Sequence, residues 1–244
     1  MKITICRFAS VHVSLLIIAA VCSAQDNLAR VVKQNEPHTI TVALEFSKKH
    51  RSPVLKALAV VSAVDPNAHA SGFIVGDGLV MTSYHVVSGK LSNGKKRLLG
   101  FKPEDELEVK VYVNGCNARV VKVDEQADLA LLRVCARSKP PQRPTFRTLP
   151  SQDEQLLLIA RPGDQRMIRK GSFSGMYSFG GQQYWSVKID GQDGFSGSPV
   201  YNGKGEIVGV FCLYDWKRGV ALLSPGNRAQ QFLADYDAGV QSQP

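Results

Sequence analysis

The stretch Gly194-Phe195-Ser196-Gly197-Ser198-Pro199-Val200 decides how we interpret this chain of 244 residues. Glycines lie two residues before and one residue after Ser196, and an apolar run, residues 207–211, follows. Gly194 lacks a Cβ and can turn its backbone N–H toward the same point as that of Ser196, forming an oxyanion hole. The same residues would also suit a surface turn between two strands. Ser196 is therefore a candidate nucleophile that needs a base from elsewhere in the chain.

A candidate base is His85, which follows a predicted strand, turn and second strand over residues 71–84. Such a position can aim an imidazole rigidly into a cleft, although a purely structural histidine is the alternative. The remaining histidines are less suitably placed. His12 lies in a leader, His38 and His50 lie in an N-terminal extension, and His69 is expected in the loop that follows Asp65.

A catalytic imidazole is normally oriented by a buried carboxylate, and Asp128 is the candidate for that role. Asp128 directly precedes the apolar run Leu129–Val134, which predicts a strand. A solvent-facing turn carboxylate is the other interpretation of this residue. The combination of His85, Asp128 and Ser196, each beside a predicted strand, favours a catalytic triad over three unrelated residues.

With these residues the chain resembles the chymotrypsin-like serine protease clan, and most of all its HtrA/Deg and glutamyl-endopeptidase-like branches. The resemblance lies in the order His, Asp, Ser and in four blocks between residues 70 and 233: SGFIVGDGLVMTSYHVV, VNGCNARVVKVDEQADLALLRV, GFSGSPVYNGKGEIVGVF and GVALLSPGNRAQQFL. It implies an all-β fold of two six-stranded antiparallel barrels with the site between them. It also implies that His85 is the general base, Asp128 its orienting partner, Ser196 the nucleophile, and the N–H groups of Gly194 and Ser196 the oxyanion hole. Polypeptide substrates are implied, without a metal or an organic cofactor.

Two of the chain's departures from these families bear on how the protein would be activated and regulated. Phe195 stands where trypsin-like zymogens carry an aspartate that pairs with a freed N-terminus, so we expect no activation of that kind. Few residues follow Leu233, so we expect no PDZ domain of the kind that HtrA proteins usually append.

The chain divides into six expected segments. A basic start, a short apolar run and a small-residue ending predict a secretory signal peptide over residues 1–24, cleaved after Ala24, so we expect a periplasmic or secreted protein without a stable membrane anchor. An N-terminal extension, partly helical, is expected over 25–53. The first barrel follows over 54–137, and three prolines mark a linker over 138–150. The second barrel covers 151–226, and a short helix and tail, capped at Asn227, cover 227–244.

The cysteines and the charges limit the possible partners. Cys116, Cys135 and Cys212 remain after the leader, and a predicted meander of strands brings Cys116 beside Cys135, so we predict that they form a disulfide and that Cys212 is a buried free thiol. The formal net charge is +9, but acidic and basic residues are interspersed and stacking aromatics are lacking, so we expect no nucleic-acid partner. A catalytically weak member of the same fold, acting as a binding module, is the alternative function. The oligomeric state is not predicted.

Three residues are candidates for the primary specificity pocket: Asp190, Phe211 and Tyr214. Asp190 lies where trypsin-like enzymes keep a carboxylate on the pocket floor, and also where HtrA proteins keep a structural aspartate. Phe211 replaces the histidine of glutamyl endopeptidases, and Tyr214 would narrow the entrance. We predict a preference for Val, Ala or Leu before the scissile bond, with Lys or Arg as the alternative if Asp190 reaches the floor.

Overall fold

The computed structural model describes residues 27–49, 67–135, 143–163 and 165–241. The predicted signal peptide, residues 1–24, lies outside these ranges, and so do residues 138–142 of the predicted linker. Within them, no helix is both long and apolar enough to cross a membrane.

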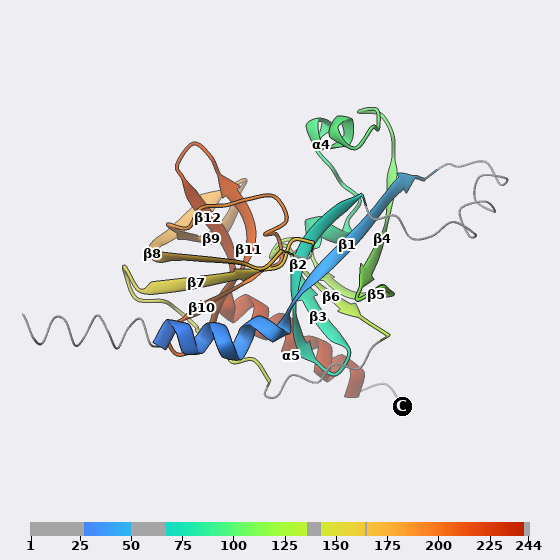
Figure 1. Cartoon of the computed structure of the whole chain (residues 1–244). Helices are drawn as coiled ribbons and strands as arrows, with labels where there is room; N and C mark the ends of the chain where they lie inside the picture. Colours follow the sequence, from blue (N-terminus) through green and yellow to red (C-terminus); the bar gives the residue numbers. More distant parts are fainter. Residues whose placement is uncertain (1–26, 50–66, 136–142, 164, 242–244) are drawn as a thin grey trace, which may run out of the picture.

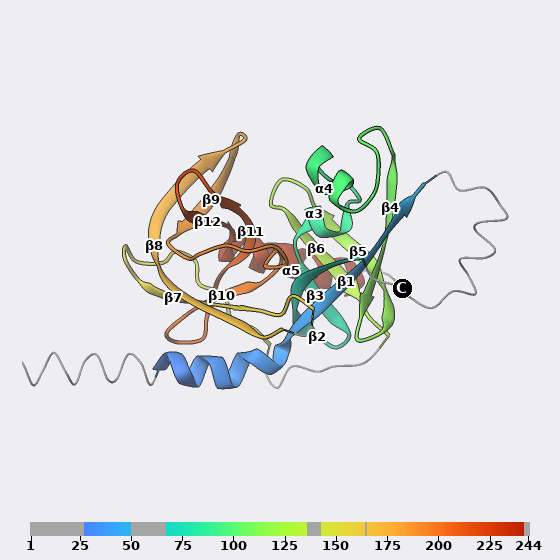
Figure 2. The ribbon, with the colours of Figure 1, turned by 45° about the horizontal axis from the view of Figure 1, so that its top comes forward.

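Two closed antiparallel β-barrels of six strands each stand side by side (Figures 1 and 2), as predicted. The strand order is β1-β2-β3-β6-β5-β4 in the first barrel and β10-β11-β12-β9-β8-β7 in the second. The first barrel contains β1 (Thr39–Lys48), β2 (Ala68–Gly76), β3 (Leu79–Thr82), β4 (Leu107–Val113), β5 (Cys116–Asp124) and β6 (Leu129–Arg133). The second contains β7 (Gln155–Ala160), β8 (Met167–Phe179), β9 (Gln182–Val187), β10 (Pro199–Asn202), β11 (Ile207–Asp215) and β12 (Val220–Pro225).

The helical segments lie outside the barrels. They are residues 27–35, the 3₁₀ turn η1 (Glu36–His38), α3 (Tyr84–Val87), α4 (Asn93–Leu98) and α5 (Gly226–Gln241). The C-terminal helix covers most of the segment that was expected to hold a short helix and a tail, and Asn227 lies in its first turn rather than at a cap before it. In Figures 1 and 2, α5 runs from the second barrel toward the first. Its Phe232 carbonyl accepts a hydrogen bond from Lys122 Nζ of β5 at 2.9 Å, which ties the helix to the first barrel.

The prediction of an N-terminal extension over residues 25–53 is wrong for residues 39–48, whereas residues 27–38 are helical and lie outside the barrel. Thr39–Lys48 is β1, which pairs with β2 and β4 and closes the first barrel, so this barrel begins at residue 39 and not at 54. The signal is present in the sequence, because Ile40, Val42, Leu44 and Phe46 occupy alternate positions and all are buried.

A hydrophobic core lies between the barrels in addition to one inside each of them. It includes Phe73 and Met81 from the first barrel, Ile159 and Val210 from the second, and Phe232 from α5. The helix at residues 27–35 inserts Leu28 and Val31 into the same core. Because this core packs the two barrels against each other, it holds the two sides of the cleft in a defined relative position.

Candidate active site

Three side chains predicted from the sequence meet at the junction of the barrels. His85 Nε2 lies 2.8 Å from Ser196 Oγ, and His85 Nδ1 lies 2.8 Å from Asp128 Oδ2. The fold explains this meeting. His85 is in α3, directly after β3, while Asp128 directly precedes β6, and β3 pairs with β6 in antiparallel register, so both residues lie at one end of the same strand pair. Ser196 enters from the turn before β10 of the second barrel.

Asp128 holds His85 through two hydrogen bonds, one to its backbone and one to its imidazole ring. One carboxylate oxygen accepts from the backbone N–H of His85 at 2.8 Å, and the other faces His85 Nδ1. The Asp128 backbone is left-handed, with φ of +53°, a conformation that aspartate tolerates better than most residues. Its side chain is 13% exposed against 41% for His85, so the carboxylate is shielded while the imidazole faces the cleft. This is the arrangement that fixes one tautomer and stabilises an imidazolium.

The turn around Ser196 depends on glycine. Gly194 has φ of +87°, and a Cβ there would lie 2.5 Å from the Cβ of Pro162. In the described part of the chain, the backbone N–H of neither Gly194 nor Ser196 donates a hydrogen bond, whereas the intervening Phe195 N–H donates to Gln192 O at 3.2 Å. These two N–H groups are therefore available to bind an oxyanion.

Ser71, which the sequence analysis did not single out, holds this turn from the first barrel. Its backbone N–H donates to Ser196 O at 3.0 Å, and its hydroxyl donates to Gly194 O at 2.9 Å. The same hydroxyl accepts from the N–H of Arg161 at 2.9 Å, and Ser71 is fully buried. Ser71 therefore fixes the peptide groups on both sides of the candidate oxyanion hole. Nothing in its local sequence distinguishes it from an ordinary strand serine.

Phe195 anchors the turn by packing. It is fully buried, and its ring makes an edge contact with Phe211, with 6.0 Å between the ring centroids. An apolar anchor thus occupies the position where an aspartate would pair with a freed N-terminus, consistent with the expectation that this chain does not use such an ion pair.

Two hollows flank Ser196, and His85 and Ser196 line both of them. The β11 hollow has a volume of about 550 Å³ and is bounded by Tyr184, Phe211, Leu213, Tyr214 and Trp216. The α4 hollow has a volume of about 510 Å³, and the large apolar side chains in its lining are Leu44, Phe46, Val86, Leu91, Leu98 and Leu99. The cleft thus offers binding space on both sides of the candidate nucleophile.

Of the three candidate specificity residues, two line a hollow and one does not. Phe211 and Tyr214 line the β11 hollow, and the Tyr214 ring lies against the backbone of Gly191. Asp190 is exposed and is part of the lining of neither hollow. His69, expected in a loop, instead belongs to β2 and lines the α4 hollow.

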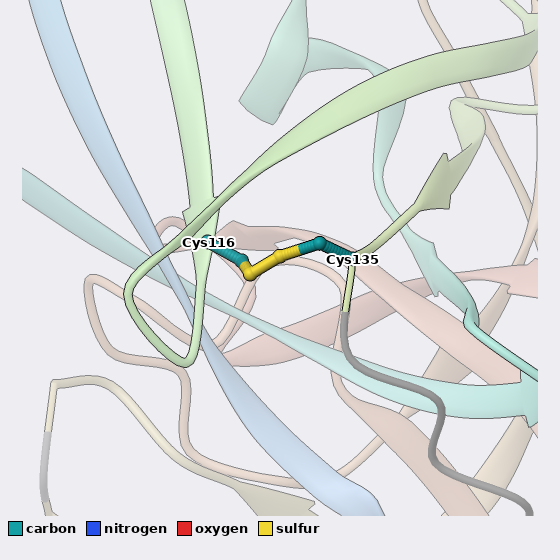
Figure 3. Close-up of a disulfide and its surroundings, with 2 residues drawn as sticks. All are labelled: Cys116 and Cys135. Carbon is teal, nitrogen blue, oxygen red and sulfur yellow. A yellow bond between two sulfur atoms is a disulfide. The ribbon is translucent and has the colours of Figure 1, made fainter.

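The cysteines are arranged as predicted. Cys116 and Cys135 form a disulfide that joins β5 to the end of the first barrel, with their Cα atoms 6.0 Å apart (Figure 3). Cys212 is free and buried in β11. Burial raises the pKa of the Cys212 thiol, and the nearby negative charge of Asp128 raises this pKa further. The thiol is therefore protonated and shielded, and not a competing nucleophile.

The site contains no evident metal-binding group. Over the ranges that the structure covers, no three or more His, Cys, Asp or Glu side chains are arranged to hold a metal ion.

Two β-barrels with a linked serine, histidine and aspartate at their junction define the architecture of a chymotrypsin-like protein. The family profile of the trypsin-like peptidase domain matches residues 70–210, more than half of the chain. This chain belongs to the trypsin-like peptidase family.

Relatives among known proteins agree with this assignment. The glutamyl endopeptidase of Staphylococcus epidermidis is 27% identical over 150 residues, which cover 57% of this chain and 52% of that protein. The serine protease HTRA1 of Xenopus laevis is 28% identical over 190 residues, which cover 70% of this chain and 36% of that protein. The chain thus spans about half, or less, of the length of these relatives. Among solved structures, the active form of the Rv3671c protease from M. tuberculosis shares the fold, with a TM-score of 0.58 and 19% identity over 84% of this chain and 82% of that one.

Proposed function

We propose that this protein is a serine endopeptidase that cleaves polypeptides through an acyl-enzyme intermediate. The observation that carries the proposal is the continuous chain of two 2.8 Å contacts from Ser196 Oγ through the His85 ring to the Asp128 carboxylate. Family membership adds support, because the relatives include proteases and polypeptides are the substrates that a peptidase domain implies.

The geometry supports the following steps. His85 Nε2 accepts the proton of the Ser196 hydroxyl as Oγ attacks the carbonyl carbon of the scissile bond. The oxyanion is bound by the N–H groups of Gly194 and Ser196, and Asp128 stabilises the imidazolium. The imidazolium then gives its proton to the amine as the peptide C–N bond breaks. In the second half of the reaction, His85 deprotonates a water molecule that attacks the acyl-enzyme carbonyl, the bond to Ser196 Oγ breaks, and His85 returns the proton to Oγ.

The decisive experiment is covalent labelling. A fluorophosphonate probe should label the purified protein at Ser196, and Ser196→Ala should abolish both labelling and hydrolysis, with a rate loss of about 10⁶-fold. If the wild-type protein binds polypeptides but is neither labelled nor able to cleave them, the alternative of a catalytically weak binding module is correct.

For the residue before the scissile bond we retain the proposal of Val, Ala or Leu. The placement of Asp190 outside the lining of both hollows favours this preference over Lys or Arg. Mass spectrometry of an unfolded protein after digestion tests it: dominant cuts after Lys and Arg that disappear in Asp190→Ala would overturn the preference.

We also propose that the protein is exported to the periplasm or secreted, on the evidence of the leader-like residues 1–24 alone. N-terminal sequencing of the protein recovered from its host should begin at Gln25. Recovery of the intact N-terminus from the cytoplasm would exclude this proposal.

A further inference from the structure

The α4 hollow is a second binding surface beside Ser196, on the side away from β11. Its floor is formed by side chains of the first barrel's own core, because Leu44, Phe46 and Val86 line it and each is only 4% exposed. A volume of about 510 Å³ falls within the range typical of ligand pockets. The core of the first barrel therefore opens toward the cleft through an apolar surface.

The rim of this hollow carries an unusually exposed leucine. Leu98 is the last residue of α4, lines the hollow and is 83% exposed, the highest exposed fraction among the large apolar residues that the structure describes. A ligand that covers both Leu98 and the hollow would remove a large apolar surface from water, and this burial would favour binding.

The position of α4 is held by polar contacts. The Ser92 side chain accepts a hydrogen bond from Lys95 N–H at the start of the helix, and Lys96 Nζ donates to the carbonyl oxygens of Pro103 and Asp105 at 2.7 and 2.8 Å. Lys95 Nζ lies 3.5 Å from Asp193, in the turn that precedes Ser196. These contacts place Leu98 at the rim of the cleft.

The charged groups at this hollow lie at its rim and not on its floor. Lys95 and Asp193 face each other and are mostly exposed, and His69 is exposed as well. A charged side chain placed on the apolar floor would lose its hydration without gaining a partner. The floor of the hollow therefore suits apolar groups better than charged ones.

The β11 hollow indicates in which direction a polypeptide would lie across the cleft. The family resemblance assigns Phe211 and Tyr214 to the pocket for the residue before the scissile bond, and both line the β11 hollow. Because Ser196 and His85 lie between the two hollows and line both, a chain with its acyl part along β11 places its leaving-group part in the α4 hollow.

We infer that the α4 hollow is a specificity subsite for a large apolar side chain, such as Leu, Met or Phe, at the first or second position after the scissile bond. This inference rests on the proposed peptidase function and names the substrate feature that Leu98 recognises.

The test compares Leu98→Ser with the matched control Leu149→Ser, which removes another exposed leucine (57% exposed) that lines neither hollow. Unfolded proteins are digested with each variant and the residues after each cut are counted by mass spectrometry. The wild-type protein and Leu149→Ser should favour Leu, Met and Phe over Gly and Asp. In Leu98→Ser this preference should fall about tenfold, because contact with one branched side chain is lost.

A second readout isolates the leaving-group side. When an amino acid amide is added, its amine nitrogen attacks the acyl-enzyme carbonyl, the bond to Ser196 Oγ breaks, and the amine proton passes through His85 to Oγ. Leucinamide should capture the acyl group about ten times better than glycinamide in the wild-type protein, and this ratio should fall toward one in Leu98→Ser. Equal capture of both amides by the wild-type protein would overturn the inference.

The fluorophosphonate label separates the possible failures. If the wild-type protein is labelled and cleaves without an apolar preference after the cut, the subsite is wrong and the peptidase proposal stands. A Leu149→Ser effect as large as that of Leu98→Ser also overturns the subsite. Absence of both labelling and cleavage in the wild-type protein overturns the two proposals together.

Discussion

The hydroxyl of Ser71 connects the first barrel to the turn that carries Ser196, and its removal tests how far this turn depends on that contact. In Ser71→Ala, the carbonyl of Gly194 and the N–H of Arg161 both lose their buried partner, so the free energy of unfolding should fall by about 1–3 kcal/mol. The labelling rate of Ser196 should fall about 100-fold under conditions where the variant is fully folded, because the oxyanion hole is displaced.

Ser198→Ala is the matched control for that experiment. Ser198 is also fully buried, but its hydroxyl has no hydrogen-bond partner in the described part of the chain. Its replacement should leave the labelling rate nearly unchanged. If Ser198→Ala abolishes labelling and Ser196→Ala does not, the nucleophile has been assigned to the wrong serine.

Cys212 gives a prediction about reactivity. Because burial raises the pKa of its thiol, Cys212 should not react with a thiol reagent in the native protein at neutral pH. When protein that lacks residues 1–24 is denatured without reductant, the thiol of Cys212 should become reactive, while Cys116 and Cys135 stay bridged. Three reactive thiols would exclude the disulfide.

At the scale of single elements, the Cys116–Cys135 disulfide closes a sequence separation of 19 residues. Replacing both cysteines by serine should lower the free energy of unfolding by about 3 kcal/mol, because the unfolded chain regains the entropy of that loop. Denaturant titration of the double variant and of the wild-type protein, with and without reductant, measures this difference. A reductant effect that persists in the double variant would show that another cysteine is involved.

The elements also show what local sequence can and cannot predict. The β4–β5 hairpin was predictable because Asn114 and Gly115 both adopt positive φ, of +51° and +75°, which this dipeptide favours. Strand β1 was missed although its alternation is present, because the residues around it are a mixture of Lys, Glu and His with Pro37, which is typical of an extension. The α4 hollow could not be predicted, since α4 and the turn at Asp193 come together only through the packing of the two barrels.

The same contrast applies to the candidate site. His85, Asp128 and Ser196 each lie in a local pattern, and their order along the chain was sufficient to propose that they meet. Ser71 and His69 carry no such pattern, because a serine or histidine in a strand has the same local sequence whether or not it faces a cleft. Asp190 shows the converse, because a position that matches a family pattern does not establish where its side chain lies.

For the whole molecule, the core between the barrels predicts a single cooperative transition. Val31 is 1% exposed and belongs to this core together with residues of both barrels. Val31→Asp should therefore lower the free energy of unfolding by at least about 3 kcal/mol, since it buries an unpaired charge. Gln34→Asp, on the exposed side of the same helix, should have little effect.

The measurement follows two signals through a denaturant titration. Loss of secondary structure, which reports both barrels, and loss of fluorophosphonate labelling, which reports their junction, should have the same midpoint in the wild-type protein and in Val31→Asp. Labelling that disappears well before the secondary structure would show that the barrels separate while each remains folded.

The order in which the parts of the site occur along the chain has a consequence for protein synthesis. The ribosome adds His85 and Asp128 with the first barrel, before it adds Ser196, and it adds the helix α5, which packs on the core between the barrels, after Ser196. A nascent chain therefore carries the base and its carboxylate without a nucleophile until Ser196 is added. Under the proposed function, proteolytic activity arises only after Ser196 and the remaining strands of the second barrel have been translated, so the growing polypeptide cannot cleave itself before that point.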